Sequence, residues 1–385
     1  MRLLVLLWLL IGASPVAARP EQSGLAADTE ARWVPFTLND ANQIRFIAVL
    51  NGRPVTAILD TGVSHSVLSR PLASRLHLRI APGATADAIG GGLPIGWIES
   101  PPLAFGGFDR RGGRLAVATL PDSATGGDPV DLLVGRDLLA PFALEIDYDG
   151  GVFRLLPSGR IPFRGIDLPL MIGGDAPSYL SDVPVNGAPS RLIVDTGDGN
   201  AITLSTAAWR RIGGAARTTT TLSYGVGGSA VTELAILPSL ALGALHAGAT
   251  QIAIEREGGY SQGAGASGRI GTGFLRRYHI LLDPAARHMI LTPGQRAEAS
   301  PPRSTTGLLV AHDGGVLRVL HVMRGSPAAD DGWQTGDTIC AVDGVLVADR
   351  PPDAAEHWPI AAPGTMISLM RCGGTARTLM SRAFY

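Results

Sequence analysis

Two copies of the tripeptide Asp-Thr-Gly, at residues 60–62 and 195–197, are the part of this chain best suited to do chemistry. Each copy follows an apolar run, Ala57-Ile58-Leu59 in one case and Leu192-Ile193-Val194 in the other. Each run is typical of a buried strand. We therefore expect each strand to deliver a carboxylate to its end. The glycine allows a close backbone approach that a side chain would obstruct.

The carboxylates of Asp60 and Asp195 would act as a pair. Two carboxyl groups at close range cannot both ionise easily, so they tend to share one proton. The ionised member can take a proton from a water molecule while the protonated member polarises a substrate carbonyl. This chemistry hydrolyses peptide bonds without a covalent intermediate, a metal or another cofactor. Supporting roles in the two loops are predicted for Thr61, Gly62, Thr196 and Gly197, the threonines bracing each loop against the other.

The two motifs lie in matching places of an internal repeat. Asp60 and Asp195 are 135 residues apart (195 − 60), and the same spacing relates Asn51-Gly52 to Asn186-Gly187. At this spacing, or at one a single residue longer, Pro54 matches Pro189, Gly135 matches Gly271 and Asp147 matches Asp283. Residues 32–157 and 165–294 are therefore two copies of one structure, called here the first unit and the second unit.

Both units are predicted to be mainly β. Their apolar residues alternate and are separated by turn dipeptides, which favours strands. Asn51-Gly52 and Asn186-Gly187 are expected to form two-residue hairpin turns. Short helices are expected after the motifs, over Pro71–Leu76 and Thr206–Ile212.

Both units resemble retropepsin-type lobes of the aspartic peptidases, especially the bacterial aspartyl proteases. The resemblance rests on Asp60-Thr61-Gly62-Val63-Ser64, the glycine-rich stretch at 89–92 and Leu132-Leu133-Val134-Gly135-Arg136-Asp137. It implies two small β-barrel lobes that form a pseudo-dimer, with a buttress at Gly135-Arg136-Asp137. It also implies two hairpin flaps over the substrate cleft, with Gly90, Gly91, Gly227 and Gly228 at their tips.

The second unit departs from this pattern in two places. Asp198-Gly199-Asn200 follows its motif, where small residues are usual, and Arg269-Ile270-Gly271-Thr272-Gly273 lacks the Arg-Asp pair. We expect Asp198 to add negative charge near the pair. These departures leave open a second interpretation, a non-catalytic protein that binds extended peptides. A third arrangement, in which units of two chains pair, is disfavoured by the short connection at 158–164.

The C-terminal part is predicted to be a separate domain. Residues 295–304, with Ala299-Ser300-Pro301-Pro302, are interpreted as a linker. Residues 305–385 resemble a bacterial PDZ domain, because their short motifs occur in the expected order: Gly325-Ser326-Pro327-Ala328-Ala329, Gly336-Asp337-Thr338-Ile339, Val342-Asp343-Gly344 and Pro363-Gly364-Thr365. The resemblance implies a small α+β domain that binds the C-terminal tail of a partner peptide.

Two features of this domain have alternative interpretations. Gly307-Leu308-Leu309-Val310 is either the loop that binds the peptide carboxylate or only the first strand. Cys340 and Cys372 are either a disulfide or two buried thiols.

The N-terminus predicts export. Arg2, the apolar run Leu3–Ile11 and Val16-Ala17-Ala18 form a signal peptide over residues 1–18; the alternative is an uncleaved membrane anchor. No other segment approaches the length of a membrane span. We therefore expect a secreted or periplasmic protein, and the sequence leaves open whether residues 19–31 are a propeptide.

Composition also excludes two classes of protein. The chain is 45% hydrophobic and 17% charged, so it is not disordered. A net charge of −1 gives no reason to expect a nucleic-acid partner or an anionic membrane. The expected partner, a peptide or protein substrate, follows instead from the chemistry of the aspartate pair and from the resemblance to aspartic peptidases.

Overall fold

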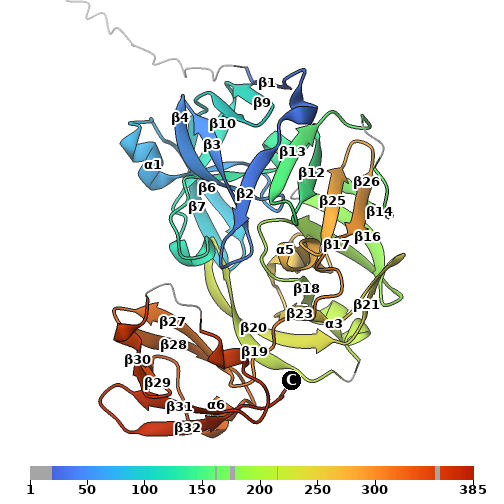
Figure 1. Ribbon diagram of the computed structural model, residues 1–385. Helices are drawn as coiled ribbons and strands as arrows, with labels where there is room; N and C mark the ends of the chain where they lie inside the picture. Colours follow the sequence, from blue (N-terminus) through green and yellow to red (C-terminus); the bar gives the residue numbers. More distant parts are fainter. Residues whose placement is uncertain (1–19, 161–162, 174–177, 215, 352–355) are drawn as a thin grey trace, which may run out of the picture.

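The protein is mainly β, as predicted, and its strands form three sheets (Figure 1). The computed structural model describes residues 20–160, 163–173, 178–214, 216–351 and 356–385. The predicted signal peptide, residues 1–18, lies outside them. None of the helices in these ranges has the length and apolar character needed to cross a membrane.

The first unit consists of strands with two short α-helices and one 3₁₀ turn. Its elements are β2 (Val34–Leu38), β3 (Ile44–Leu50), β4 (Arg53–Leu59), β5 (Val67–Ser69), α1 (Arg70–Arg75), β6 (Ala81–Ala88), β7 (Gly91–Glu99), β8 (Leu103–Phe105), β9 (Phe108–Arg111), β10 (Arg114–Ala118), η2 (Asp122–Ala124), β11 (Leu132–Val134), α2 (Arg136–Leu139), β12 (Ala143–Asp147) and β13 (Val152–Leu156).

The second unit repeats this order. Its elements are β14 (Ile166–Pro169), β15 (Met171–Gly173), β16 (Ser178–Val185), β17 (Ala188–Asp195), β18 (Ile202–Ser205), α3 (Thr206–Ile212), β19 (Thr219–Gly225), β20 (Gly228–Leu237), β21 (Leu240–Leu242), β22 (Leu245–Ala247), β23 (Thr250–Glu255), α4 (Tyr260–Gly263), β24 (Gly268–Gly271), α5 (Thr272–Leu275), β25 (Tyr278–Asp283) and β26 (His288–Pro293). Neighbouring strands run β3-β4-β11-β5-β10-β7-β6 in the first unit and β16-β17-β24-β18-β23-β20-β19 in the second.

A continuous sheet joins the two units. Strand β12 of the first unit pairs antiparallel with β25 of the second, with Leu144 opposite Leu282 and Ile146 opposite Ile280. All four of these side chains are buried in one core that includes residues of both units. The two units are therefore held in a fixed relation by backbone pairing as well as by apolar packing.

The local chemistry predicted from the sequence explains how the motif strands are placed. Asn51 and Gly52 both have positive φ, as do Asn186 and Gly187, which is the backbone that a two-residue hairpin turn requires. Helix α3 has its predicted bounds, whereas α1 begins one residue earlier than predicted. The reason is that Ser69 caps α1 by accepting a hydrogen bond from the Leu72 amide.

The residues before the repeat belong to the first unit. Strand β1 (Gln22–Leu25) pairs with β9, and the 3₁₀ turn η1 (Thr29–Ala31) buries Thr29, whose hydroxyl donates to the Leu155 carbonyl. Glu21 accepts a hydrogen bond from the buried guanidinium of Arg110 at 2.9 Å. These contacts extend the first unit beyond the boundary that the repeat predicts. One of them, from Glu21, supplies the carboxylate partner that the buried Arg110 requires.

The C-terminal part forms the third sheet, with its own apolar core (Figure 1). Residues 295–304 contain no helix or strand. The elements that follow are β27 (Leu308–Asp313), β28 (Val316–Val322), α6 (Pro327–Asp330), β29 (Thr338–Val342), β30 (Val345–Leu346), η3 (Val347–Asp349), η4 (Trp358–Ile360), β31 (Met366–Arg371) and β32 (Ala376–Met380). A disulfide joins Cys340 in β29 to Cys372 after β31, which settles the alternative left by the sequence.

This third sheet is docked on the β19–β20 hairpin of the second unit. Arg324 forms an ion pair with Glu233, and the Thr220 hydroxyl lies 2.8 Å from Nε2 of His321. Phe384 and Tyr385 pack against Leu234 and Met323 in a separate small core. The docking is thus partly apolar and partly polar, and it falls on the hairpin that carries Gly228.

Candidate active site

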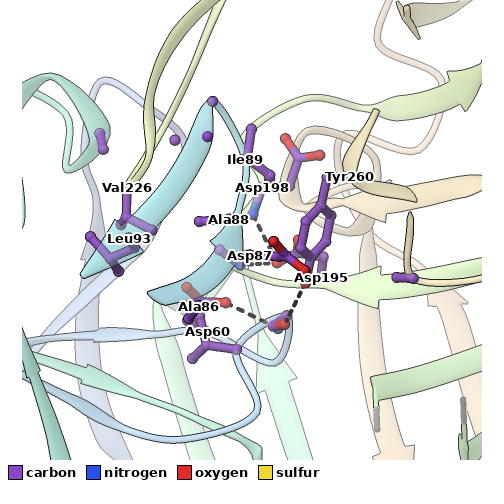
Figure 2. Close-up of a pocket in the computed structure, with 18 of the residues that line it drawn as sticks. Asp60, Ala86, Asp87, Ala88, Ile89, Leu93, Asp195, Asp198, Val226 and Tyr260 are labelled. Carbon is purple, nitrogen blue, oxygen red and sulfur yellow. Dashed lines mark hydrogen bonds between the residues drawn. The ribbon is translucent and has the colours of Figure 1, made fainter. Parts of the chain in front are cut away.

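The two motif aspartates meet at the bottom of one cleft of about 700 Å³. Asp60 directly follows β4, and Asp195 is the last residue of β17. Strand β4 runs parallel to β11, and β17 runs parallel to β24. The two motif loops therefore lie at equivalent sheet edges. Figure 2 shows the side chains of Asp60 and Asp195 converging from the two units.

The motif threonines connect the two loops by reciprocal hydrogen bonds. The Thr61 amide donates to Oγ1 of Thr196, and the Thr196 amide donates to Oγ1 of Thr61, both at 3.0 Å. Each hydroxyl then donates across the interface at 2.8 Å, to the carbonyl of Val194 or of Leu59. Both threonines are fully buried, so each loop is held by the main chain of the other.

The motif glycines let each loop approach the opposite carboxylate. A Cβ atom on Gly62 would lie 2.3 Å from Oδ1 of Asp195, and one on Gly197 would lie 2.3 Å from Cγ of Asp60. Both contacts are too short for any side chain. The glycines also orient their own motif, because the Gly62 and Gly197 amides donate to Asp60 and Asp195 at 3.0 and 2.9 Å.

The surroundings of the pair favour protonated carboxyl groups. Burial raises the pKa of Asp60 to about 6, against hydrogen bonds from the Gly62 and Val63 amides that lower it. Burial, the Asp60 charge and the Asp198 charge raise the pKa of Asp195 well above its ordinary value, although Arg269 opposes this. The pair titrates as a unit, and its first proton is lost above the ordinary carboxyl range.

The two loops are braced by different side chains. In the first unit, Oδ1 of Asp137 accepts hydrogen bonds from the Ser66 amide and hydroxyl, and the Ser66 hydroxyl accepts one from the Gly135 amide. In the second unit, Gly273 occupies the place of Asp137, and the Thr272 hydroxyl donates instead to the Thr196 carbonyl at 2.9 Å. The second unit, which lacks the Arg-Asp pair as noted from the sequence, thus braces its loop with a threonine.

Asp198 is neutralised by a buried arginine, which the sequence analysis did not identify. Nε of Arg269 donates to Oδ2 of Asp198 at 2.8 Å and lies 3.9 Å from Oδ2 of Asp195. Nη1 of Arg269 also contacts Glu255 and donates to the Ser261 hydroxyl. Burial alone would raise the pKa of Asp198, but Arg269 and the hydrogen bonds from Asn200 lower it, so Asp198 is ionised.

A signal for this pair exists in the repeat. Arg269 stands opposite Thr203 as Leu133 stands opposite Val67, and Asp198 follows its motif as Val63 does. Two apolar positions of the first unit are therefore charged, with opposite signs, in the second. Complementary changes of this kind indicate an ion pair.

Tyr260 is a further residue beside the pair that the sequence analysis missed (Figure 2). Its hydroxyl lies 3.5 Å from the Gly62 carbonyl, and the Arg269 guanidinium lies 5.6 Å from its ring. Burial, together with the Asp195 and Asp60 charges, raises the pKa of Tyr260 to about 12. Tyr260 thus presents a neutral hydroxyl beside the carboxylates.

The predicted flap glycines meet above the cleft. Gly90 and Gly91 lie at the turn between β6 and β7, and Gly227 and Gly228 lie at the turn between β19 and β20. The Gly227 amide donates to the Ile89 carbonyl at 3.0 Å, so the two hairpin tips are in contact. Gly90 and Gly91 line the cleft. Gly227 and Gly228 do not, and in their hairpin the neighbouring residues Gly225 and Val226 line it instead.

The residues predicted to bind a C-terminal peptide lie in the third sheet and do not line this cleft. Leu308, Leu309 and Val310 belong to β27, which pairs with β28. The Gly307 amide donates to the Ser304 hydroxyl, and the Leu308 amide donates to Thr306 at 3.4 Å. Leu308, Leu309 and Val310 thus lie in the first strand of this sheet, and their role in peptide binding stays a prediction.

No group of three or more His, Cys, Asp or Glu side chains is placed to hold a metal ion anywhere in the described ranges. The cleft presents carboxylates, backbone amides and hydroxyls. These groups can bind and orient a peptide carbonyl and can move protons.

Comparison with known proteins gives one family match and no curated relative. Residues 46–138 match the family model of the aspartyl proteases, and no curated protein matches the chain. The matched residues run from β3 to α2 and include Asp60, the first flap hairpin and the Asp137 brace. This part of the chain is thus similar to an aspartyl protease domain, which supports a protease-like function.

Proposed function

We propose that this chain is an aspartic endopeptidase, in which Asp60 and Asp195 form one proton-sharing pair. The observation that carries the proposal is the reciprocal packing of the two motifs, in which each glycine lies against the carboxylate of the other unit. A structural turn needs no such approach between residues so far apart in the sequence. The family match of residues 46–138 supports the same chemistry.

We assign Asp60 as the base of the pair and Asp195 as the acid, because burial and the Asp60 and Asp198 charges favour the protonated form of Asp195. Asp60 accepts a proton from a water molecule bound between the carboxyl groups, and the water oxygen attacks the peptide carbonyl carbon. Asp195 donates its proton to the carbonyl oxygen, which gives a tetrahedral diol. Asp60 then passes its proton to the nitrogen as the C–N bond breaks, and Asp195 takes a proton from a diol hydroxyl, which returns the pair to its singly protonated state.

The interpretation as a non-catalytic binding protein rested on the charge at Asp198 and on the missing Arg-Asp pair of the second unit. That charge is paired with Arg269, so it does not prevent one member of the pair from ionising. We also propose that the two units are the protease lobes, that residues 305–385 act as a PDZ-like domain toward a peptide tail, and that the protein is secreted or periplasmic.

The test is hydrolysis of a denatured protein by the folded chain, compared with Asp60→Asn and Asp195→Asn. Each variant is expected to lose activity by at least about a thousandfold, because each removes one of the two proton-transfer groups. Asp109→Asn, in the exposed part of β9, is the matched control and is expected to retain wild-type activity. Full activity in either active-site variant, or none in the wild type, would overturn the proposal.

A further inference from the structure

The two walls of the cleft are equivalent in the repeat but opposite in chemistry. The first-unit wall is defined here by Val63, Val67, Ile95 and Leu133, and the second-unit wall by Asp198, Thr203, Thr232 and Arg269. The members correspond in that order. The first pair follows the motif directly, and the second and fourth pairs are matched by the strand pairing of Val67 with Leu133 and of Thr203 with Arg269. Ile95 and Thr232 lie at the same distance after the flap glycine of their own hairpin. At each of these positions the first unit has an apolar side chain and the second unit has a polar or charged one.

The four side chains of the first-unit wall offer no hydrogen-bond partner, so this surface favours an apolar group. Val67 and Leu133 belong to a core cluster that includes Leu93 of the first flap, and Ile95 and Trp97 pack against the same cluster. A polar side chain placed here would lose its hydrogen bonds to water without replacement, whereas a large apolar one would be buried favourably.

The second-unit wall offers a hydrogen-bond donor. Arg269 is 2% exposed and lines the cleft, with Nε bonded to Asp198 and Nη1 bonded to Glu255 and Ser261. Its remaining nitrogen, Nη2, makes no hydrogen bond to another residue in the part of the chain that the structure describes. A guanidinium carries five N–H donors in a fixed planar array, so a donor is held ready for a substrate acceptor.

The charges around this donor exclude two kinds of side chain. Oδ1 of Asp198 accepts hydrogen bonds from the Asn200 amide and side chain, and Oδ2 accepts them from Thr203 and Arg269, so no free lone pair remains for a substrate cation. A substrate carboxylate would approach Asp198, Glu255 and the catalytic pair, whose negative charges exceed the single positive charge of Arg269.

An extended peptide can use both walls at once. The walls flank the aspartate pair, one from each unit, so a peptide whose scissile bond lies over the pair meets one wall on each side of that bond. Alternate side chains of an extended strand point in opposite directions, which allows residues near the bond to reach opposite walls.

We infer that the preferred substrate has a bulky apolar residue on one side of the scissile bond and a neutral hydrogen-bond acceptor, such as Gln or Asn, on the other. This inference rests on the proposed peptidase function and names the substrate class of the same cleft. Arg269 is the specificity-determining residue for the polar position.

The experiment is cleavage of a peptide library by the full folded chain, with the residues on both sides of the bond randomised, followed by kcat/KM for matched peptides. We expect at least a tenfold preference for Gln over Leu at one position and for Leu over Gln at another. Apolar or charged preferences on both sides would overturn the inference and leave the peptidase function standing. No cleavage of any peptide would overturn the peptidase function and the inference with it.

Variants assign the polar preference to the wall. Arg269→Lys keeps a cation beside Asp198 but lacks the planar array of donors, and it is expected to reduce the Gln preference at least tenfold. The combined variant Asp198→Val, Arg269→Leu, Glu255→Ala replaces the charged group by residues of the kind found in the first-unit wall, and it is expected to prefer Leu on both sides. The matched control, Leu133→Met in the first-unit wall, is expected to retain the Gln preference. A Gln preference unchanged in Arg269→Lys would contradict the role of Arg269.

Discussion

Around Asp60 the motif loop is held by Asp137 and rests on apolar side chains, whereas around Asp195 it is held by Thr272 and rests on the Asp198–Arg269 ion pair. The threonine and glycine contacts at the centre are nevertheless the same in both loops. The geometry of the carboxylates therefore depends on the central contacts, and the side chains that surround those contacts are free to differ between the units. A single buried arginine makes this difference electrostatic as well as steric.

The largest expected effect is the loss of stability when the Asp198–Arg269 ion pair is broken. Arg269→Leu leaves Asp198 and Glu255 buried without their cation, which is expected to cost about 3–5 kcal/mol of unfolding free energy in urea. The combined variant Asp198→Val, Arg269→Leu, Glu255→Ala is expected to recover most of that loss, since it removes the unpaired charges as well. Equal destabilisation of both variants would show that Arg269 acts by packing rather than by charge.

The pH dependence of hydrolysis tests whether the pair is set by burial. Because the pKa of Asp60 is raised to about 6, both carboxyl groups hold protons below that pH and no base is available. We expect kcat/KM to rise about tenfold per pH unit up to about pH 6, and to fall at higher pH when Asp195 loses its proton. A rate that is highest near pH 4 and declines steadily toward neutrality would contradict this assignment.

The flap tips allow a comparison between single glycines. Gly90 has φ of +95°, and a Cβ atom on it would lie 2.3 Å from the Gly228 carbonyl oxygen. Gly228 also has positive φ, but its nearest contact would be 3.8 Å. Gly90→Ala is expected to separate the tips and raise KM about tenfold, and Gly228→Ala to raise it less, because only the first adds a steric clash to backbone strain. Equal KM values for the two variants would show that the tips do not need to touch.

A smaller loss of stability than that of Arg269→Leu is expected for the two braces. Asp137→Ala removes acceptors for both the Ser66 amide and hydroxyl and is expected to cost about 2–3 kcal/mol of unfolding free energy. Thr272→Val removes one hydroxyl donor from the Thr196 carbonyl and is expected to cost about 1 kcal/mol. Thermal unfolding measures both. A larger loss for Thr272→Val would reverse the assignment of the stronger brace to the first unit.

The sequence predicted the parts of the fold that local patterns determine. The apolar runs before Asp60 and Asp195, the Asn-Gly turns and helix α3 depend on short-range chemistry, and the repeat aligned the two motifs. Helix α1 begins one residue before its predicted start, because Ser69, rather than Arg70, provides its cap.

The remaining features depend on contacts between residues far apart in the chain. Arg269 has no partner in its local sequence, and only the alignment of the two units indicates its pairing with Asp198, whereas Glu21 gives no sign that it neutralises Arg110. The docking of Phe384 and Tyr385 on the second flap hairpin likewise has no local pattern. Charge burial and domain packing of this kind arise only when the fold is complete.

The central claim is that Asp60 and Asp195 share one proton, and the most direct measurement is the pKa of the Asp195 carboxyl group by ¹³C NMR in the wild type and in Asp60→Asn. The Asp60 charge is one cause of the raised pKa of Asp195, so that pKa is expected to fall clearly when Asp60 is replaced. The same pKa in both proteins would show that the two carboxyl groups do not interact, and it would contradict the shared pair.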